Sequence, residues 1–267
     1  MRKEDLQAVN SLNSGIFNLA VFLAPGLGGV IISFFNPGYA LLVNSVSFLA
    51  SFIAIASLRM KMNERDSSRH SIWGEIREGF EFVAKTKPIL YTNLAMITSV
   101  FGTTLFLTLL VFHLKDSINL NTVMIGWLLS IGGVGAILGA VTSNFFRKRF
   151  SYRSILFTAS VIGGLSILCF GLLETYFWLV IMNAVGTFCA SMMSPCIITI
   201  RQTLTPDHLL GRVQATSRLM TWIFMPLAAF LAGILAEAIG TDLTIMLAGA
   251  ISTLASIPYL HHSLKDK

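Results

Sequence analysis

The side chains of this sequence that could contact a polar ligand lie inside long apolar runs. The candidates for lining a substrate passage are seven uncharged hydrogen-bonding residues and one tryptophan: Asn18, Asn93, Thr98, Thr103, Asn183, Thr187, Ser191 and Trp222. Amide and hydroxyl groups can bind a small-molecule substrate without burying a charge. A single Asn or Thr in such a run also bonds neighbouring helices, so each candidate keeps a structural interpretation beside the functional one.

The sequence lacks the patterns that an enzyme or an ATP-driven pump requires. The five histidines fall in connectors or in the tail without a nucleophile motif or paired-ligand spacing, and no GxxxxGK[ST] phosphate loop occurs. Cys169, Cys189 and Cys196 lie in apolar runs without metal-ligand spacing, which indicates reduced packing residues. We therefore expect no enzyme activity, no metal and no cofactor.

The elements that must position these side chains are membrane helices. Charged residues make up 12% of the chain and hydrophobic residues 54%, with a mean hydropathy of +0.74, whereas soluble domains are about 25% charged. Apolar runs of roughly 20 residues predict transmembrane helices, and eight such runs occur: Gly15–Phe34, Gly38–Leu58, Leu90–Phe112, Val123–Phe146, Ser154–Leu173, Phe177–Ile200, Leu219–Ala236 and Leu243–Leu260. We expect an all-α membrane protein with eight transmembrane helices, embedded in a lipid bilayer.

The basic residues predict the orientation of these helices. If the N-terminus is cytoplasmic, 18 of the 19 Lys and Arg residues fall on the cytoplasmic side and only Lys115 falls outside. Short cytoplasmic loops collect Lys and Arg, so we expect both termini to be cytoplasmic. The net charge of +6 follows from this bias, and we expect no nucleic-acid partner.

The polar connector between the second and third runs contains an amphipathic segment. Its apolar face consists of Ile72, Trp73, Ile76, Phe80 and Val83. The periodicity predicts a helix that lies on the cytoplasmic membrane surface. A linker helix that packs on the ends of the membrane helices would show the same pattern.

The chain also contains an internal repeat. Asp5–Ile31 and Asp207–Leu235 each run from an acid through a polar stretch into an apolar run interrupted by proline, Pro25 or Pro226. Internal repeats in membrane proteins indicate transporters built from duplicated halves. A period of about 200 residues makes 90–267 one complete six-helix half, 1–60 the last two helices of a preceding half, and 61–89 the cytoplasmic connector.

Small residues line two of the predicted helices. Ala20, Ala24 and Gly28 recur every four residues, with Pro25, Gly26 and Gly29 beside them. The fourth run has two similar rows, Gly132-Ala136-Ala140 and Gly135-Gly139-Ser143. Such rows allow close helix approach. This predicts either static tight packing or, with the proline, a helix that bends or rocks during transport.

The segment Ala24-Pro25-Gly26-Leu27-Gly28-Gly29, with Ala20 before it, resembles the antiporter motif of exporters in the major facilitator superfamily. The segment differs from that motif only at the first glycine, which is alanine in this sequence. The resemblance is to twelve-helix bacterial exporters of the macrolide-efflux and enterobactin-exporter type, and it extends over family helices five to twelve. Glu78–Val83 and Pro88 match the cytoplasmic helix of that family.

One loop departs from the family pattern. The segment Asn144–Arg149 keeps the basic cluster of the loop between family helices eight and nine, here Arg147, Lys148 and Arg149. It lacks the acid and the glycine that the family usually has there.

The resemblance implies export of small, hydrophobic or siderophore-like molecules across a bacterial cytoplasmic membrane. Measured against the family, four N-terminal helices are missing, so the partners implied are that four-helix segment or a second copy of the chain. All 13 acidic residues lie in loops or at the ends of the runs, which places any coupling carboxylate in the missing part. The alternative is a non-transporting remnant, or a half-module that needs another chain.

Overall fold

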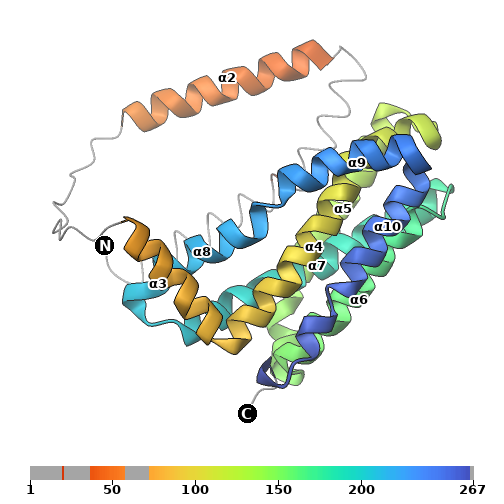
Figure 1. Cartoon of the computed structure of the whole chain (residues 1–267). Helices are drawn as coiled ribbons and strands as arrows, with labels where there is room; N and C mark the ends of the chain where they lie inside the picture. Colours follow the sequence, from red (N-terminus) through yellow and green to blue (C-terminus); the bar gives the residue numbers. More distant parts are fainter. Residues whose placement is uncertain (1–19, 21–36, 58–71, 265–267) are drawn as a thin grey trace.

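The structure is a computed structural model that describes residues 20, 37–57 and 72–264 (Figure 1). All the regular elements in these ranges are helices. The order is α2 (Pro37–Ala56), α3 (Ile72–Lys85), α4 (Lys87–Phe112), α5 (Thr122–Arg149), α6 (Tyr152–Phe170), α7 (Tyr176–Leu204), α8 (Leu210–Trp222), α9 (Met225–Ile239) and α10 (Thr241–Leu254). A π-helical turn, η1 (His113–Ser117), extends α4, and short 3₁₀ turns are η2 (Asp207–Leu209), η3 (Ile257–Leu260) and η4 (His262–Leu264).

Six helical segments of the described chain are long and apolar enough to cross a membrane. They are Lys87–Ser117, Thr122–Arg149, Tyr152–Phe170, Tyr176–Leu204, Asp207–Ile239 and Thr241–Leu260. They match the last six predicted runs. The second run corresponds to α2, which contributes a shorter apolar segment, Leu41–Ala56, and lies apart from the bundle in Figure 1. The first run, Gly15–Phe34, lies outside the described residues except for Ala20.

Side-chain caps determine where two of the long helices begin. Asn121 precedes α5 and accepts a hydrogen bond from the Met124 amide at 2.8 Å. Ser151 precedes α6 and accepts from the Ser154 amide at 3.2 Å. These caps satisfy amides that have no partner within the helix, so each apolar run starts at a defined residue.

The seventh predicted run is broken rather than continuous. The helix starts before Leu219, since α8 begins at Leu210, and it ends at Trp222, with α9 starting at Met225. Pro226 lies in the first turn of α9, where its missing N–H costs no helical hydrogen bond. The break therefore lies where the proline interrupts the run, and it divides a polar helix from an apolar one.

Helices α5 and α7 approach each other closely. A Cβ atom at Gly135 would overlap the carbonyl of Ala184, and one at Gly139 would overlap the carbonyl of Phe188. One turn further along, the Ser143 hydroxyl donates to the Met192 carbonyl at 3.0 Å. The small-residue row of Gly135, Gly139 and Ser143 thus forms a close helix contact.

The connector helix α3 packs on α8. Val83 is buried in a cluster with Ile89, Leu209 and Val213, and a Cβ atom at Gly79 would overlap the Thr216 hydroxyl of α8. Trp73, at the start of the predicted apolar face, is 80% exposed. The segment is helical, and part of its apolar face contacts the bundle; its position on the membrane surface stays a prediction.

Candidate functional site

A cavity of about 270 Å³ lies inside the six-helix bundle, between α4, α6 and α7, with Ser252 of α10 at its edge. None of the residues that line it carries a charge. Phe106 and Phe170 meet edge to face on its wall, with ring centroids 5.0 Å apart. The cavity is thus a mainly apolar space with a few hydroxyl and amide groups.

The lining residues of this cavity differ in exposure. Leu107 of α4 and Ala190 of α7 are exposed. The other lining residues are buried or half-buried.

Three of the predicted substrate-lining residues lie on the wall of this cavity: Thr103, Asn183 and Thr187. Asn183 donates from Nδ2 to the Leu128 carbonyl at 2.9 Å, and the Thr187 hydroxyl donates to the Gly132 carbonyl at 2.6 Å. Both bonds cross from α7 to α5. Asn183 and Thr187 therefore link α7 to α5 through hydrogen bonds. Contact with a substrate stays a prediction for Thr103, Asn183 and Thr187.

The other predicted lining residues lie elsewhere. Thr98 donates to the Leu94 carbonyl of its own helix, Ser191 is half-buried outside the lining of this cavity, and Trp222 is 56% exposed at the end of α8. Asn93 is completely buried in a different polar cluster. Asn18 lies outside the described residues.

That polar cluster surrounds a buried arginine. Arg201, in the last turn of α7, is 5% exposed, and its Nη2 donates to Asn93 Oδ1 at 2.6 Å and to Met96 Sδ at 3.2 Å. Asn93 in turn donates from Nδ2 to the Ser217 hydroxyl of α8 at 3.0 Å. No carboxylate of the described chain pairs with Arg201, whose positive charge lies at the negative end of the α7 dipole.

The predicted run Phe177–Ile200 ends one residue before Arg201, which leaves this arginine outside the expected helix. In the structure α7 continues to Leu204, which places this arginine within the helix. Pro206 was the signal that could have located the helix end, because the residue before a proline is disfavoured in the α conformation.

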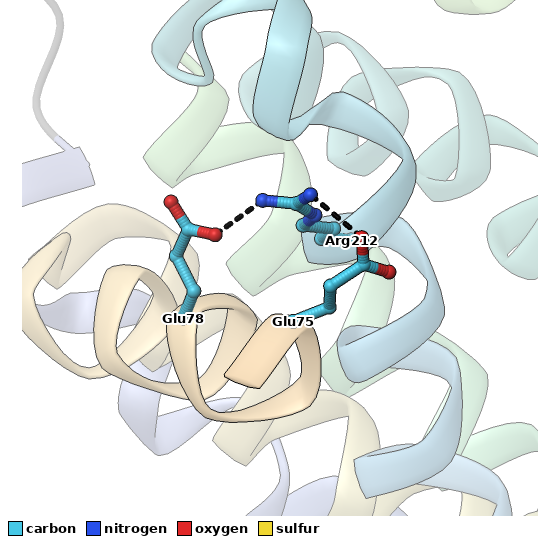
Figure 2. A network of polar contacts seen from close by, with 3 residues as sticks. All are labelled: Glu75, Glu78 and Arg212. Carbon is cyan, nitrogen blue, oxygen red and sulfur yellow. Dashed lines mark hydrogen bonds and ion pairs between the residues drawn. The ribbon is translucent and has the colours of Figure 1, made fainter. Parts of the chain in front are cut away.

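Arg212 joins α8 to the connector helix α3 through two carboxylates. Figure 2 shows its guanidinium between Glu75 and Glu78, one turn apart on α3. Nη2 lies 2.8 Å from Glu75 Oε1, and Nη1 donates to Glu78 Oε2. Because Gly79 also contacts α8, this Arg212 clamp and the glycine fix α3 on the bundle.

The basic cluster that follows the fourth run lies in the last turn of α5 rather than in a loop. Arg147 lies over the Tyr152 ring, 3.7 Å from its centroid, and Arg149 lies 4.7 Å from the centroid of Phe145. Lys148 is exposed. Cations in a last turn favour the helix dipole, which gives the cluster a structural role at this helix end.

The exporter-like motif lies almost entirely outside the described residues. Ala24, Pro25, Gly26, Gly28 and Gly29 lie outside the described residues, and of the motif only Ala20 is described. Its proposed role in helix packing therefore stays a prediction.

Two features of the described chain were not predicted. Ser160 and Ser252 line the cavity and have buried hydroxyls without a hydrogen-bond partner. His113, which was placed in a connector, is 2% exposed in η1, with Nδ1 3.1 Å from Asp242 Oδ1 of α10. No sequence signal distinguishes these residues from ordinary serines and loop histidines.

Comparison with known proteins gives one family over nearly the whole chain. The family described as "Transmembrane secretion effector" matches residues 1–266. The multidrug efflux pump Tap of Mycolicibacterium fortuitum is 28% identical over 246 residues, which cover 90% of this chain and 59% of that protein. YvqJ, an MFS-type transporter of Bacillus subtilis, is 23% identical, with 97% and 63% covered. The chain thus spans about three fifths of the length of these relatives.

Solved structures share the fold. A bacterial homologue of the iron transporter ferroportin, in its inward-facing state, superposes with a TM-score of 0.69 at 19% identity, covering 97% of this chain and 64% of that one. A bacterial metal transporter gives a TM-score of 0.60 at 17% identity, covering 97% and 66%. At these identities the likeness concerns the fold.

Proposed function

Because the chain belongs to the transmembrane secretion effector family of the major facilitator superfamily, we propose that it exports small, mainly apolar molecules across a bacterial cytoplasmic membrane. The observation that carries this proposal is the family match over residues 1–266. The efflux activity named for the Tap relative supports the direction of transport. The uncharged cavity between α4, α6 and α7 supports the substrate class.

The proposed architecture is one six-helix half, residues 90–267, joined by the connector 61–89 to two helices of the other half, residues 1–60. Facilitator carriers bind substrate between two halves and alternate access by rocking one half against the other. The wall opposite α4 and α7 then comes from a further four-helix segment or from a second copy. The break between α8 and α9 supplies a joint where one helix of the half can bend.

Orientation can be tested by cysteine labelling in cells. With both termini cytoplasmic, Lys115→Cys reacts with a membrane-impermeant maleimide from outside, whereas Lys148→Cys and His208→Cys react only after permeabilisation. The three native cysteines are replaced by alanine beforehand. Reversed labelling at two of the three positions would rule out this topology.

A second candidate is a non-transporting remnant or a half-module that requires another chain. The chain spans 59% of the length of the Tap relative. A half-module would export only beside its partner, and a remnant would not export with any partner.

One transport experiment separates these possibilities. The chain is expressed in a drug-sensitive bacterium alone and together with the first four helices of the Tap relative, and efflux of the uncharged dye Nile red is followed with and without an uncoupler. We expect uncoupler-sensitive export in the co-expressing cells and little in cells with the chain alone. Gly28→Leu should reduce export more than the matched variant Leu27→Val, because a large side chain blocks close helix approach. Absence of export in every arm would favour the remnant.

A further inference from the structure

We propose that Arg201 of α7 and Arg218 of α8 form a binding site for a phosphate group, at the end of the six-helix bundle that we expect to be cytoplasmic. The phosphate belongs either to an anionic lipid headgroup or to a free anion. This inference goes beyond the export of apolar molecules and does not depend on it. The site is separate from the uncharged cavity, because neither arginine lines that cavity.

Arg201 carries a buried charge for which the described chain supplies no counter-charge. The residue is 5% exposed, and Nη2 donates only to uncharged acceptors, the Asn93 amide oxygen and the Met96 sulfur. Nε is buried without a partner. Nη1 makes no hydrogen bond in the described chain and does not belong to its buried unpaired atoms, so it keeps some accessible surface. Nη1 is therefore the nitrogen through which Arg201 can meet an added acceptor.

Helix α7 compensates this charge only in part. The helix dipole places about half a negative charge at the C-terminal end of a helix, and Arg201 lies in the last turn of α7. Roughly half of the guanidinium charge therefore remains. Because buried charges are normally paired with an opposite charge, this end of α7 should attract an anion.

Arg218 adds a second positive charge beside the first. It follows Ser217, whose hydroxyl accepts a hydrogen bond from Asn93, the residue that also binds Arg201. The two like charges are close enough to repel each other. Arg218 is exposed, and its guanidinium lies 5.9 Å from the centroid of the Trp222 ring. A ligand can therefore reach Arg218 directly.

The other arginine of α8 shows what a satisfied partner looks like on this helix. Arg212 binds Glu75 and Glu78 of α3. Arg218 has no carboxylate of the described residues within ion-pair distance. Two arginines without a carboxylate in the described chain thus lie near each other on α7 and α8.

The chemistry of the pair indicates phosphate, and its surroundings indicate a lipid. A guanidinium presents N–H donors in a planar arrangement that matches the oxygens of a phosphate. Basic pockets between membrane helices on the cytoplasmic side bind anionic lipid headgroups. Leu219, Trp222 and Ile223, close to Arg218 in α8, are exposed and offer apolar surface to an acyl chain. We therefore expect an anionic lipid to supply the phosphate.

Native mass spectrometry of the detergent-solubilised full chain can count bound lipids. Anionic phosphatidylglycerol is titrated beside phosphatidylcholine, whose headgroup amine neutralises the phosphate. We expect one phosphatidylglycerol to bind saturably at concentrations at which phosphatidylcholine does not. Arg218→Gln should raise the half-saturating concentration about fivefold, the contribution of one basic residue near anionic lipid. Arg218→Lys, which keeps the charge, should restore part of the affinity.

Arg201→Gln should weaken phosphatidylglycerol binding as well. Because this side chain is buried, thermal unfolding checks the fold of each variant, and Arg218→Gln, at an exposed side chain, decides the test if Arg201→Gln does not fold. Lys148→Gln is the matched control. Lys148 is an exposed basic residue in the last turn of α5, and its replacement should leave the half-saturating concentration unchanged.

Inorganic phosphate distinguishes the two sources of the anion. It is compared with chloride at equal ionic strength, while thermal unfolding is followed in phosphatidylcholine nanodiscs. Phosphate that stabilises the wild-type chain more than Arg218→Gln would assign the site to a free anion. The proposal is overturned if neither phosphatidylglycerol nor phosphate binds, or if Arg218→Gln and Lys148→Gln change lipid binding equally. Because no transport is measured, failure of this test is distinguishable from failure of the proposed export.

Discussion

Arg201 of α7 donates a hydrogen bond to Asn93 of α4, with Nη2 and Oδ1 2.6 Å apart and both side chains almost fully buried. Arg201 has no carboxylate partner in the described chain. Of the two acceptors that its Nη2 contacts, the Asn93 amide oxygen is the nearer. Removing one partner of a buried charge leaves its desolvation uncompensated. This pair therefore ties two helices that are far apart in sequence.

We expect Asn93→Ala to lower the free energy of unfolding by about 2–3 kcal/mol. Asn93→Asp keeps an acceptor at the same position and adds a counter-charge, so it should restore most of the stability. The measurement is thermal unfolding of the detergent-solubilised protein. Thr98→Ala is the control, because the Thr98 hydroxyl bonds only to its own helix. If Thr98→Ala lost as much stability as Asn93→Ala, the bond between Arg201 and Asn93 would not be the cause of the loss.

The Arg212 clamp should govern the mobility of α3. Glu75→Gln with Glu78→Gln removes both ion pairs, and we expect faster amide hydrogen exchange across residues 72–85. The effect on global stability should be small, about 1 kcal/mol or less, because all three side chains are partly exposed and screened by solvent.

Glu81→Gln is the matched control for this clamp. Glu81 pairs with Lys85 on the same helix at 2.6 Å and does not reach α8. The hydrogen bond and charge of Lys85 hold the pKa of Glu81 below its usual value. Equal exchange in the control and the clamp variant would show that Arg212 does not hold α3.

The positions of the membrane helices could be predicted because an apolar run of membrane length carries its own signal. Val123–Phe146 was predicted, and α5 is Thr122–Arg149, the added residues being the capped start and the basic last turn. Composition identifies the apolar centre of a membrane helix. Its ends depend on capping residues and on how far the helix continues into polar or charged sequence. This is why the predicted run Phe177–Ile200 stops before Arg201, which lies inside α7.

The cavity could not be predicted, because it depends on the packing of three helices rather than on any one of them. Thr103, Asn183 and Thr187 were selected as polar residues in apolar runs, and packing places all three on one wall. Ser160 and Ser252 belong to helices in which other hydroxyls bond their own backbone, such as those of Thr158 and Thr253. Their own hydroxyls have no hydrogen-bond partner in the described chain, which depends on the side-chain positions in the fold.

Because α5 and α7 are in close contact, we expect alanine substitution to change stability very differently at Gly139 and at Gly233. Gly139→Ala should lower the free energy of unfolding by about 1–3 kcal/mol, because the added methyl overlaps the Phe188 carbonyl. Gly233→Ala on α9 meets no atom within 4 Å and should be neutral or stabilising by up to about 1 kcal/mol, through helix propensity. Denaturant titration of both variants measures this. Equal effects would show that close approach of α5 and α7 is not required.

The C-terminal segment beyond α10 should become less stable in acid. His261 stacks on Tyr91 with ring centroids 3.7 Å apart, and its Nδ1 accepts a hydrogen bond from the Ser263 amide at 3.2 Å. Burial lowers the pKa of His261, and the nearby charges of His262 and Lys87 lower it further. A proton on Nδ1 would also remove the acceptor.

The sign of the effect follows from proton binding. The unfolded histidine keeps its ordinary pKa of about 6.5, so between the folded and unfolded pKa values the unfolded state binds more protons. The contribution of neutral His261 to folding stability is fully present above about pH 6.5. It is lost as the pH falls through the lower pKa that His261 has in the folded protein. Thermal unfolding at about pH 8 and about pH 5.5 should therefore show a larger acid loss in the wild-type chain than in His261→Phe, which keeps the ring stack without a proton. His208→Gln, at an exposed histidine, should retain the full acid loss. If His261→Phe lost as much stability as the wild-type chain, another group would be responsible.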